Sequence, residues 1–123
     1  MSTLLLVSFA SALGAPARYL LDRFIQSRHE RVLPWGTWTV NVTGALLLGL
    51  LVGLAREHAV SEAFVTALGA GFLGSYTTFS TFTWETVRLV EDGAYLGATL
   101  NVVLTLVVGL GAAVVGAVIP TLW

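Results

Sequence analysis

Residues 69–85, GAGFLGSYTTFSTFTWE, place three glycines directly before a run of hydroxyl side chains inside an apolar segment. The glycines are Gly69, Gly71 and Gly74, and six serines and threonines occupy Ser75–Thr83. Glycine loosens a helix, and hydroxyl groups can hydrogen-bond the backbone groups that a break sets free. Non-helical backbone at membrane depth persists only inside protein or beside a water-filled path. The stretch therefore predicts a broken membrane helix that faces a permeation route.

A continuous helix is the alternative for the same stretch. Its hydroxyl groups would then bond backward to the carbonyls of their own helix. Tyr76, Phe79 and Phe82 recur every three residues, so in a helix they would share one face and could simply pack there.

The composition is that of a membrane protein. Of 123 residues, 56 % are hydrophobic and 11 % charged, and the mean hydropathy is +0.85; soluble domains carry roughly 25 % charged residues. The net charge of −1 and the lack of a basic run give no reason to expect nucleic acid as a partner. The absence of cysteine excludes disulfides and thiolate metal sites. His29 and His58 fall in loops without a serine and acid to join them, so the sequence favours transport over catalysis.

Four apolar segments each reach the length of about 20 residues that crosses a bilayer. They are Leu4–Leu21, Pro34–Ala55, Phe64–Val87 and Tyr95–Ile119. The first could pass for a signal peptide, but it lacks a basic start and its apolar run continues past the small residues, so we expect a retained helix. The sequence thus predicts an all-α membrane protein, a single four-helix transmembrane domain over residues 1–123 whose third helix is broken.

Small residues follow a spacing of four along the second and fourth segments. The two seams are Asn41, Ala45, Gly49, Gly53 and Gly97, Asn101, Thr105, Gly109, Ala113, Ala117. Such stripes let helices approach closely, and two of them suggest at least a dimer. The polar members have two interpretations: they are hydrogen-bonding glue between helices, or they line a polar track along a pore.

Charged residues near the apolar segments are few. Arg18 lies within the first segment, where a charge requires an aqueous vestibule, a partner or a snorkelling path, and Glu85 closes the third, where an interfacial carboxylate is the plain alternative. The loops carry four arginines on one side and one arginine plus the N-terminal amine on the other, a weak bias toward termini outside. Those residues are Arg23, Arg28, Arg31 and Arg88 against Arg56.

Three motifs together resemble the Fluc fluoride channels, also called the CrcB family. They are GAPARY (Gly14–Tyr19), PWGTWTVNVTGALLLG (Pro34–Gly49) and GFLGSYTTFSTFTWE (Gly71–Glu85). The resemblance implies a four-helix subunit in the cell membrane that assembles as an antiparallel, dual-topology homodimer. It also implies two fluoride pores, a central sodium ion, and passive export of fluoride that protects the cell.

The resemblance further implies which residues serve the pore. Backbone carbonyls of Gly74 and Thr77 would hold the sodium ion. Asn101 and Thr105 take the places on the fourth segment where we expect tyrosine and serine. The implied pore residues are Arg18, Asn41, Phe79, Ser80, Thr81, Phe82, Glu85, Asn101 and Thr105.

Physical chemistry suits these residue types to a small, strongly hydrated anion. Arg18 could raise the local anion concentration, amide and hydroxyl groups can donate hydrogen bonds, and phenyl ring edges carry positive quadrupole character. Two other functions stay open. A small dual-topology exporter of drug cations would need an intramembrane carboxylate, for which only Glu85 near a helix end is available. A non-transporting membrane subunit would explain the seams but not the hydroxyl run.

Overall fold

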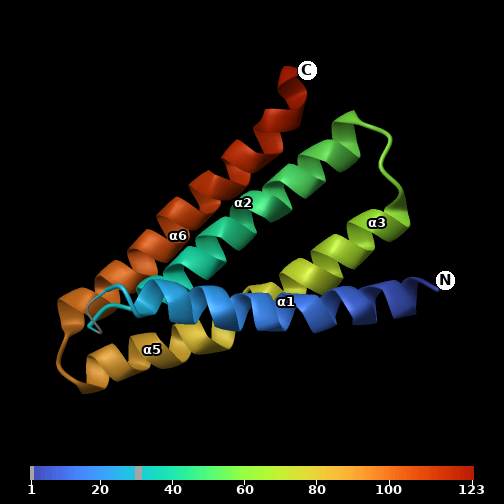
Figure 1. Ribbon diagram of the computed structural model, residues 1–123. Helices are drawn as coiled ribbons and strands as arrows, with labels where there is room; N and C mark the ends of the chain where they lie inside the picture. The colour runs from blue at the N-terminus through green and yellow to red at the C-terminus, as the bar shows by residue number, and fades with distance from the viewer. Residues whose placement is uncertain (1, 30–31) are drawn as a thin grey trace.

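The computed structural model describes residues 2–29 and 32–123, and every regular element in these ranges is helical (Figure 1). The four predicted segments are confirmed, and the third consists of four consecutive pieces. The elements are α1 (Thr3–Gln26), α2 (Trp35–Glu57), α3 (Glu62–Thr66), the π-helical η1 (Ala67–Leu73), α4 (Gly74–Tyr76), α5 (Phe79–Glu91), α6 (Tyr95–Val118) and the 3₁₀ turn η2 (Ile119–Leu122). Three helical stretches are long and apolar enough to cross a membrane: α1, α2 and the continuous run Tyr95–Leu122.

Hydroxyl side chains cap the N-termini of three of these helices. The Oγ of Ser2 accepts from the Leu5 amide at 3.4 Å, and the Oγ of Ser61 accepts from the Phe64 amide at 3.2 Å. The first amides of a helix have no partner within the helix, and a serine or threonine at the N-cap supplies one. Thr78 does the same for α5, and this cap lies directly at the break in the third segment.

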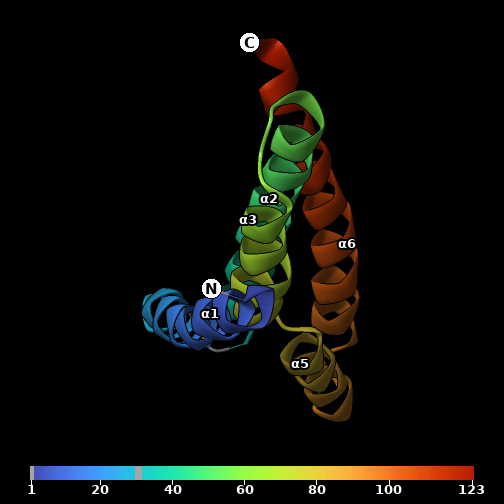
Figure 2. The same ribbon diagram turned by 90° about the vertical axis from the view of Figure 1, so that its right-hand side faces the viewer.

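The closest packing in the subunit joins α2 to α6, which run side by side in Figures 1 and 2. Gly49 lies against the backbone carbonyl of Ala113, and Gly53 against the carbonyl of Ala117, so closely that a methyl group would overlap either oxygen. The two small-residue seams therefore pack on each other within one subunit. This pairing removes the argument that two seams need a second copy of the chain. Gly109, by contrast, has no neighbour within 4 Å of where a Cβ would stand.

Helix α1 crosses the others and packs on η1 and α4; Figure 2 shows it nearly end-on. Two serine bonds hold this contact: the Oγ of Ser11 donates to the Gly71 carbonyl at 3.2 Å, and the Oγ of Ser75 donates to the Ser11 carbonyl at 3.0 Å. Gly14 is buried against the Phe72 carbonyl, where no side chain would fit. These contacts fix the half of the third segment that precedes the break.

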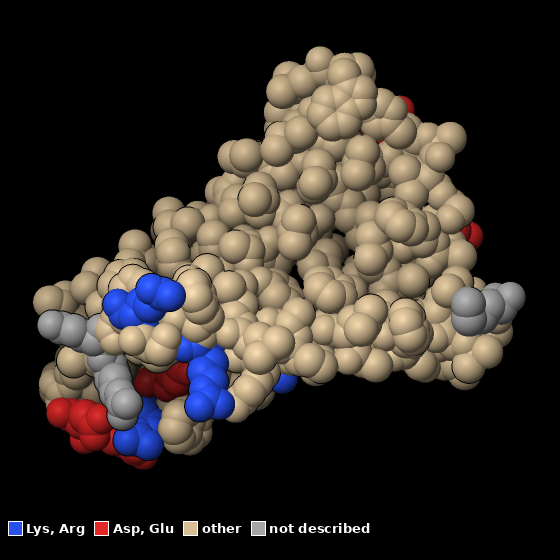
Figure 3. Space-filling view, viewed as in Figure 1, with Lys and Arg blue, Asp and Glu red and all other residues tan. Residues whose placement is uncertain are grey.

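Most charged side chains on the face in Figure 3 gather at the end of the molecule where α1 and α5 finish, and further acidic side chains show at the opposite edge. Arg23 and Arg88 lie at this end in the last turns of α1 and α5, and Arg28 lies in the turn just after α1. Each guanidinium lies over an aromatic ring four residues earlier. Arg56 lies near the end of α2, on the other side of the subunit. The predicted separation of basic residues is thus present among the described residues, while Arg31 lies outside them.

Candidate functional site

The third segment is broken at Thr77 and Thr78. Helical backbone ends at Tyr76, the next two residues are extended with ψ of 158° and 121°, and α5 begins at Phe79. The predicted break is confirmed, and the alternative of a continuous helix is wrong. The π-helical η1, separated from the break only by the short α4, carries Gly69 and Gly71, in keeping with the frequent use of such turns at functional sites.

Asn41 of α2 supplies the hydrogen-bond partners that the break removes. Its Oδ1 accepts from the Thr78 amide at 2.8 Å, and its Nδ2 donates to the Thr78 carbonyl at 2.8 Å. In a regular helix the Thr78 amide would donate to the Gly74 carbonyl four residues earlier. The side chain of Asn41 therefore holds the extended backbone from both directions and leaves the Gly74 carbonyl without its helical donor.

Thr43 and Gly44, two and three residues after Asn41 in the second-segment motif, hold the other side of the break. The Thr43 hydroxyl and the Tyr76 hydroxyl are hydrogen-bonded at 2.8 Å, and Gly44 lies against the methyl group of Thr77. Tyr76 also stacks on Phe72 with ring centroids 5.7 Å apart and is buried. Tyr76 consequently points into the subunit, and it does not share a face with Phe79 and Phe82 as it would in a continuous helix.

A cavity of about 390 Å³ opens beside the break. Phe79 and Phe82 line it with ring centroids 5.9 Å apart and ring planes tilted by 47°. Phe79 is 78 % exposed, so little of its surface is covered within the subunit. Six of the predicted site residues border this cavity, and none of its described lining residues is charged: Asn41, Gly74, Thr77, Phe79, Phe82 and Thr105.

Arg18, Ser80 and Thr81 lie around the break without bordering this cavity. The Nη1 of Arg18 donates to the Thr77 carbonyl over 3.4 Å. The hydroxyls of Ser80 and Thr81 contact the Thr78 hydroxyl at 3.4 and 3.0 Å, which builds a hydroxyl cluster at the start of α5. Since Thr78 donates to Thr81 and accepts from the Thr81 amide at 3.2 Å, this cluster also caps the helix.

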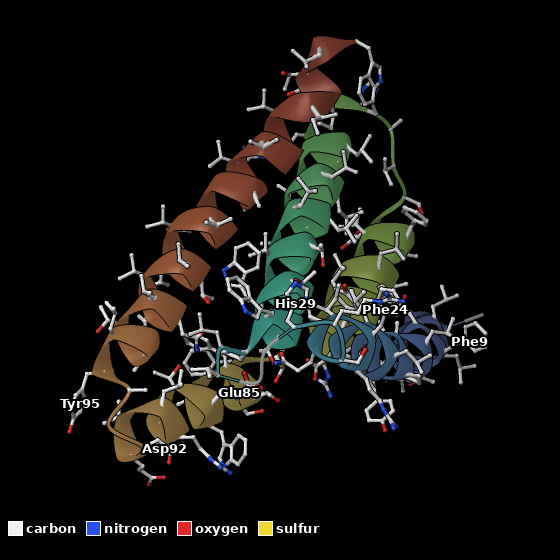
Figure 4. The ribbon with its side chains drawn as sticks, turned by 60° about the vertical axis from the view of Figure 1, so that its left-hand side comes forward. Phe9, Phe24, His29, Glu85, Asp92 and Tyr95 are labelled. Carbon is white, nitrogen blue, oxygen red and sulfur yellow. The ribbon has the colours of Figure 1, made fainter. Side chains whose placement is uncertain are left out.

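Glu85 and Asn101 lie in a second region of the subunit, nearer the charged end. Glu85 borders a cavity of about 680 Å³ together with Asp22, Arg23 and Arg88. Figure 4 shows Glu85 on α5 close to the start of α2.

The hydrogen bonds of this second region run between α2, α5 and α6. The buried hydroxyl of Thr37 donates to the Oε1 of Glu85 at 2.8 Å. The Nδ2 of Asn101 donates to the Thr86 hydroxyl at 2.8 Å. Because that hydroxyl already donates to the Phe82 carbonyl, it can only accept from Asn101. Asn101 thus joins α6 to α5, as the interpretation of interhelical glue predicts.

Thr37 is a site residue that the sequence analysis missed. It lies four residues before Asn41, on the same face of α2. Extending the spacing of four back by one turn would have found it. Three buried polar atoms have no hydrogen-bond partner in the described part of the chain: the Oε2 of Glu85, the Oγ1 of Thr105 and the Nε1 of Trp38.

Comparison with known proteins finds one matching family and many related chains. The model of the family described as CrcB-like protein, Camphor Resistance (CrcB), matches residues 5–117. A protein of Frankia casuarinae named Fluoride-specific ion channel FluC 1 is 51% identical over 118 residues, covering 92% of each chain. The FluC 1 of Streptomyces avermitilis is 48% identical over 91% of this chain and 90% of its own. The FluC of Geobacter sulfurreducens is 46% identical over 83% of both.

Proposed function

This chain belongs to the CrcB family, and from that premise we propose that it is a fluoride-specific ion channel of the cell membrane. It lets fluoride leave the cell passively and so relieves fluoride toxicity; it is a channel and not an enzyme. The observation that carries this function is the uncharged cavity beside the broken helix, which Asn41, Phe79 and Phe82 line together. A drug-cation exporter would need a carboxylate in such a place, and Glu85, the one candidate the sequence offers for that role, borders the cavity near the charged end instead.

The groups around the break suit an anion that must give up much of its water. Phe79 and Phe82 can present ring edges, whose positive quadrupole attracts an anion. Ser80, Thr81 and the unpartnered hydroxyl of Thr105 can donate hydrogen bonds. Arg18 adds positive charge beside the break. Glu85, nearer the charged end, belongs to the mouth of the same path. Asn101 borders neither cavity and serves that end by joining α6 to α5.

The second part of the proposal is an antiparallel homodimer with dual topology. Within one subunit Phe79 is 78 % exposed and the cavity is open on one face, so a pore formed there is incomplete without a second wall. A second copy supplies that wall, and the uncovered stretch of α6 around Gly109 offers a close-packing surface for it. Accessibility labelling of tags in cells should find both orientations. A single orientation for every copy would refute dual topology.

The third part is a sodium ion held by the carbonyls of Gly74 and Thr77. Hard cations prefer oxygen ligands, and the break supplies two carbonyls on one short stretch of chain. The Gly74 carbonyl has lost its helical donor to Asn41, so it suits a cation. The Thr77 carbonyl receives only the long 3.4 Å contact from Arg18. Replacing sodium by a large organic cation should lower the thermal stability of the purified dimer; equal stability in both salts would argue against the site.

Reconstitution into liposomes tests the function directly. Fluoride efflux is followed with a fluoride electrode after a potassium ionophore removes the opposing voltage. We expect rapid efflux of fluoride and none of chloride. Exchange of protons for drug cations would instead indicate the exporter, and the absence of any transport from a correctly folded dimer would favour a non-transporting subunit.

A further inference from the structure

The contacts of Asn41 point to a role beyond lining the path. We propose that Asn41 is a positioning residue: it supports conduction by fixing the extended backbone at Thr78, and thereby the two phenylalanines, and not by donating a hydrogen bond to fluoride. This inference rests on the proposed channel function and assigns the role of one residue within it.

The two bonds of Asn41 form a reciprocal pair with a single residue. Both the backbone N–H and the backbone carbonyl of Thr78 meet the side-chain amide at 2.8 Å. Since buried backbone groups at membrane depth must find partners, this amide replaces what a helix would otherwise provide. Aspartate in its protonated form has the same shape and the same pair of groups, one donor and one acceptor. Leucine has a side chain of similar shape but neither the hydrogen-bond donor nor the acceptor.

The position of Phe79 depends on this pair because little else holds it. Thr78 is both the second extended residue of the break and the N-cap of α5, and Phe79 is the next residue. With 78 % of its surface exposed, Phe79 has few side-chain contacts in the subunit that could fix it. Its backbone is set by Thr78, and Thr78 is set by Asn41. Loss of the two hydrogen bonds between Asn41 and Thr78 would therefore let the rings of Phe79 and Phe82 move.

The count of hydrogen-bond donors separates positioning from direct contact with the anion. A side-chain amide has two N–H groups, and the Thr78 carbonyl uses one. The second could serve fluoride. A protonated aspartate has a single O–H, so it can rebuild the pair with Thr78 but then has no donor left for the anion. An ionised aspartate has no donor, and its negative charge would be repelled by the Thr78 carbonyl oxygen.

The experiment uses the Asn41→Asp variant of the full chain, with two measurements made across a pH series from about 7.5 to about 5, where a buried carboxyl takes up its proton. Fluoride efflux is measured from liposomes, with protein-free liposomes correcting for leakage of hydrogen fluoride. The amide signal of Thr78 and its hydrogen exchange are followed by NMR on the detergent-solubilised dimer. At high pH we expect efflux at least about tenfold slower than wild type, which corresponds to about 1.4 kcal/mol, and a poorly protected Thr78 amide. Efflux and protection should both recover at low pH with one shared midpoint.

Asn101→Asp is the matched control, because this asparagine also lies in an apolar helix but bonds to the Thr86 hydroxyl. It should leave the Thr78 amide unchanged at every pH. Two results would overturn the inference: Thr78 protection that recovers while efflux stays low, or efflux that recovers while Thr78 stays unprotected.

A titration of the wild-type dimer keeps the inference testable even where the variant does not fold. Added fluoride should leave the side-chain NH₂ signals of Asn41 in place, and a saturating shift of those signals would show direct contact and refute positioning. Absence of fluoride efflux from the wild-type protein would refute the proposed function instead. The Thr78 measurements would then still decide whether Asn41 fixes the break.

Discussion

Replacing Phe79 or Phe82 by isoleucine separates an aromatic contact with the anion from simple packing. Isoleucine keeps an apolar side chain of similar bulk but has no ring quadrupole. Both phenylalanines line the cavity beside the break, and their rings lie 5.9 Å apart at a tilt of 47°. If their ring edges meet an ion on the path, the loss of the aromatic rings, and not the change in volume, should slow conduction.

The expected effect on folding is small. A fully buried phenylalanine contributes about 1.5–3 kcal/mol, but only about a fifth of the Phe79 surface is covered within the subunit. Isoleucine retains part of that contact, so the Phe79→Ile subunit should lose no more than about 0.5 kcal/mol. Phe82 is more buried, and its substitution should still remain below about 1.5 kcal/mol.

The expected effect on conduction is larger than the effect on folding. Aromatic edge contacts are worth about 0.5–1.5 kcal/mol beyond burial. If each ring contributes that amount where the ion must pass, one substitution slows fluoride efflux about 2- to 12-fold. Replacing both rings should multiply the two factors if the ion meets them separately.

The assay is fluoride efflux from liposomes, with elution of the intact dimer as the folding control. Phe64→Ile is the matched substitution, because Phe64 lies on α3 of the same segment, is 49 % exposed and does not border the cavity. It should conduct like wild type. Near-normal efflux from both Phe79→Ile and Phe82→Ile would refute the aromatic contact, and equal slowing by Phe64→Ile would show that the effect is not specific to the path.

Three further expectations concern the rest of the subunit. Gly49→Ala should separate α2 from α6, because its methyl group would overlap the Ala113 carbonyl, and should cost about 1–3 kcal/mol in thermal unfolding; Gly109→Ala, with open space around it, should leave subunit folding intact. Trp123→Leu should loosen the C-terminal turn by removing the stack on His58, whose ring centroid lies 5.6 Å away, as seen by faster proteolysis of the C-terminus. A variant without the Thr37 hydroxyl, Thr37→Val, should slow fluoride efflux, because Glu85 would lose the 2.8 Å bond that orients it; unchanged efflux would place Glu85 off the path.

The sequence located the break because its signal is local. Glycines followed by hydroxyls and phenylalanines lie within one stretch, and the structure breaks the helix inside it at Thr77 and Thr78. The residue that hydrogen-bonds the extended backbone could not be identified from the sequence. Asn41 and Asn101 are both single asparagines on seams spaced by four, and nothing in their spacing says that one would hold a backbone and the other a hydroxyl. Only the packing of α2 against the third segment distinguishes them.

The seams show a similar limit of sequence patterns. A spacing of four identifies a face along which a helix can approach a neighbour, but not which neighbour it meets. In the structure Gly49 and Gly53 of one seam meet Ala113 and Ala117 of the other within the subunit. The evidence for a second copy of the chain consequently shifts to the exposed Phe79 and to the open stretch of α6, which no spacing rule could have singled out.

The path of the chain requires the third segment to cross the membrane even though no single piece of it is a long apolar helix. The turn from α1 into α2 and the turn from α5 into α6 both lie at the charged end in Figure 1. Helix α2 runs away from that end, and α6 starts at it, so the chain between them must return across the same distance. If α1, α2 and α6 span the bilayer, α3 to α5 must do so together.

A membrane crossing that contains two extended residues needs partners for its backbone inside the protein, and the successive contacts of Asn41, Thr43 and Gly44 with the break provide them. The motif on α2 is therefore what allows the third segment to remain broken at membrane depth, and the break is what places two phenylalanines on an open, uncharged cavity.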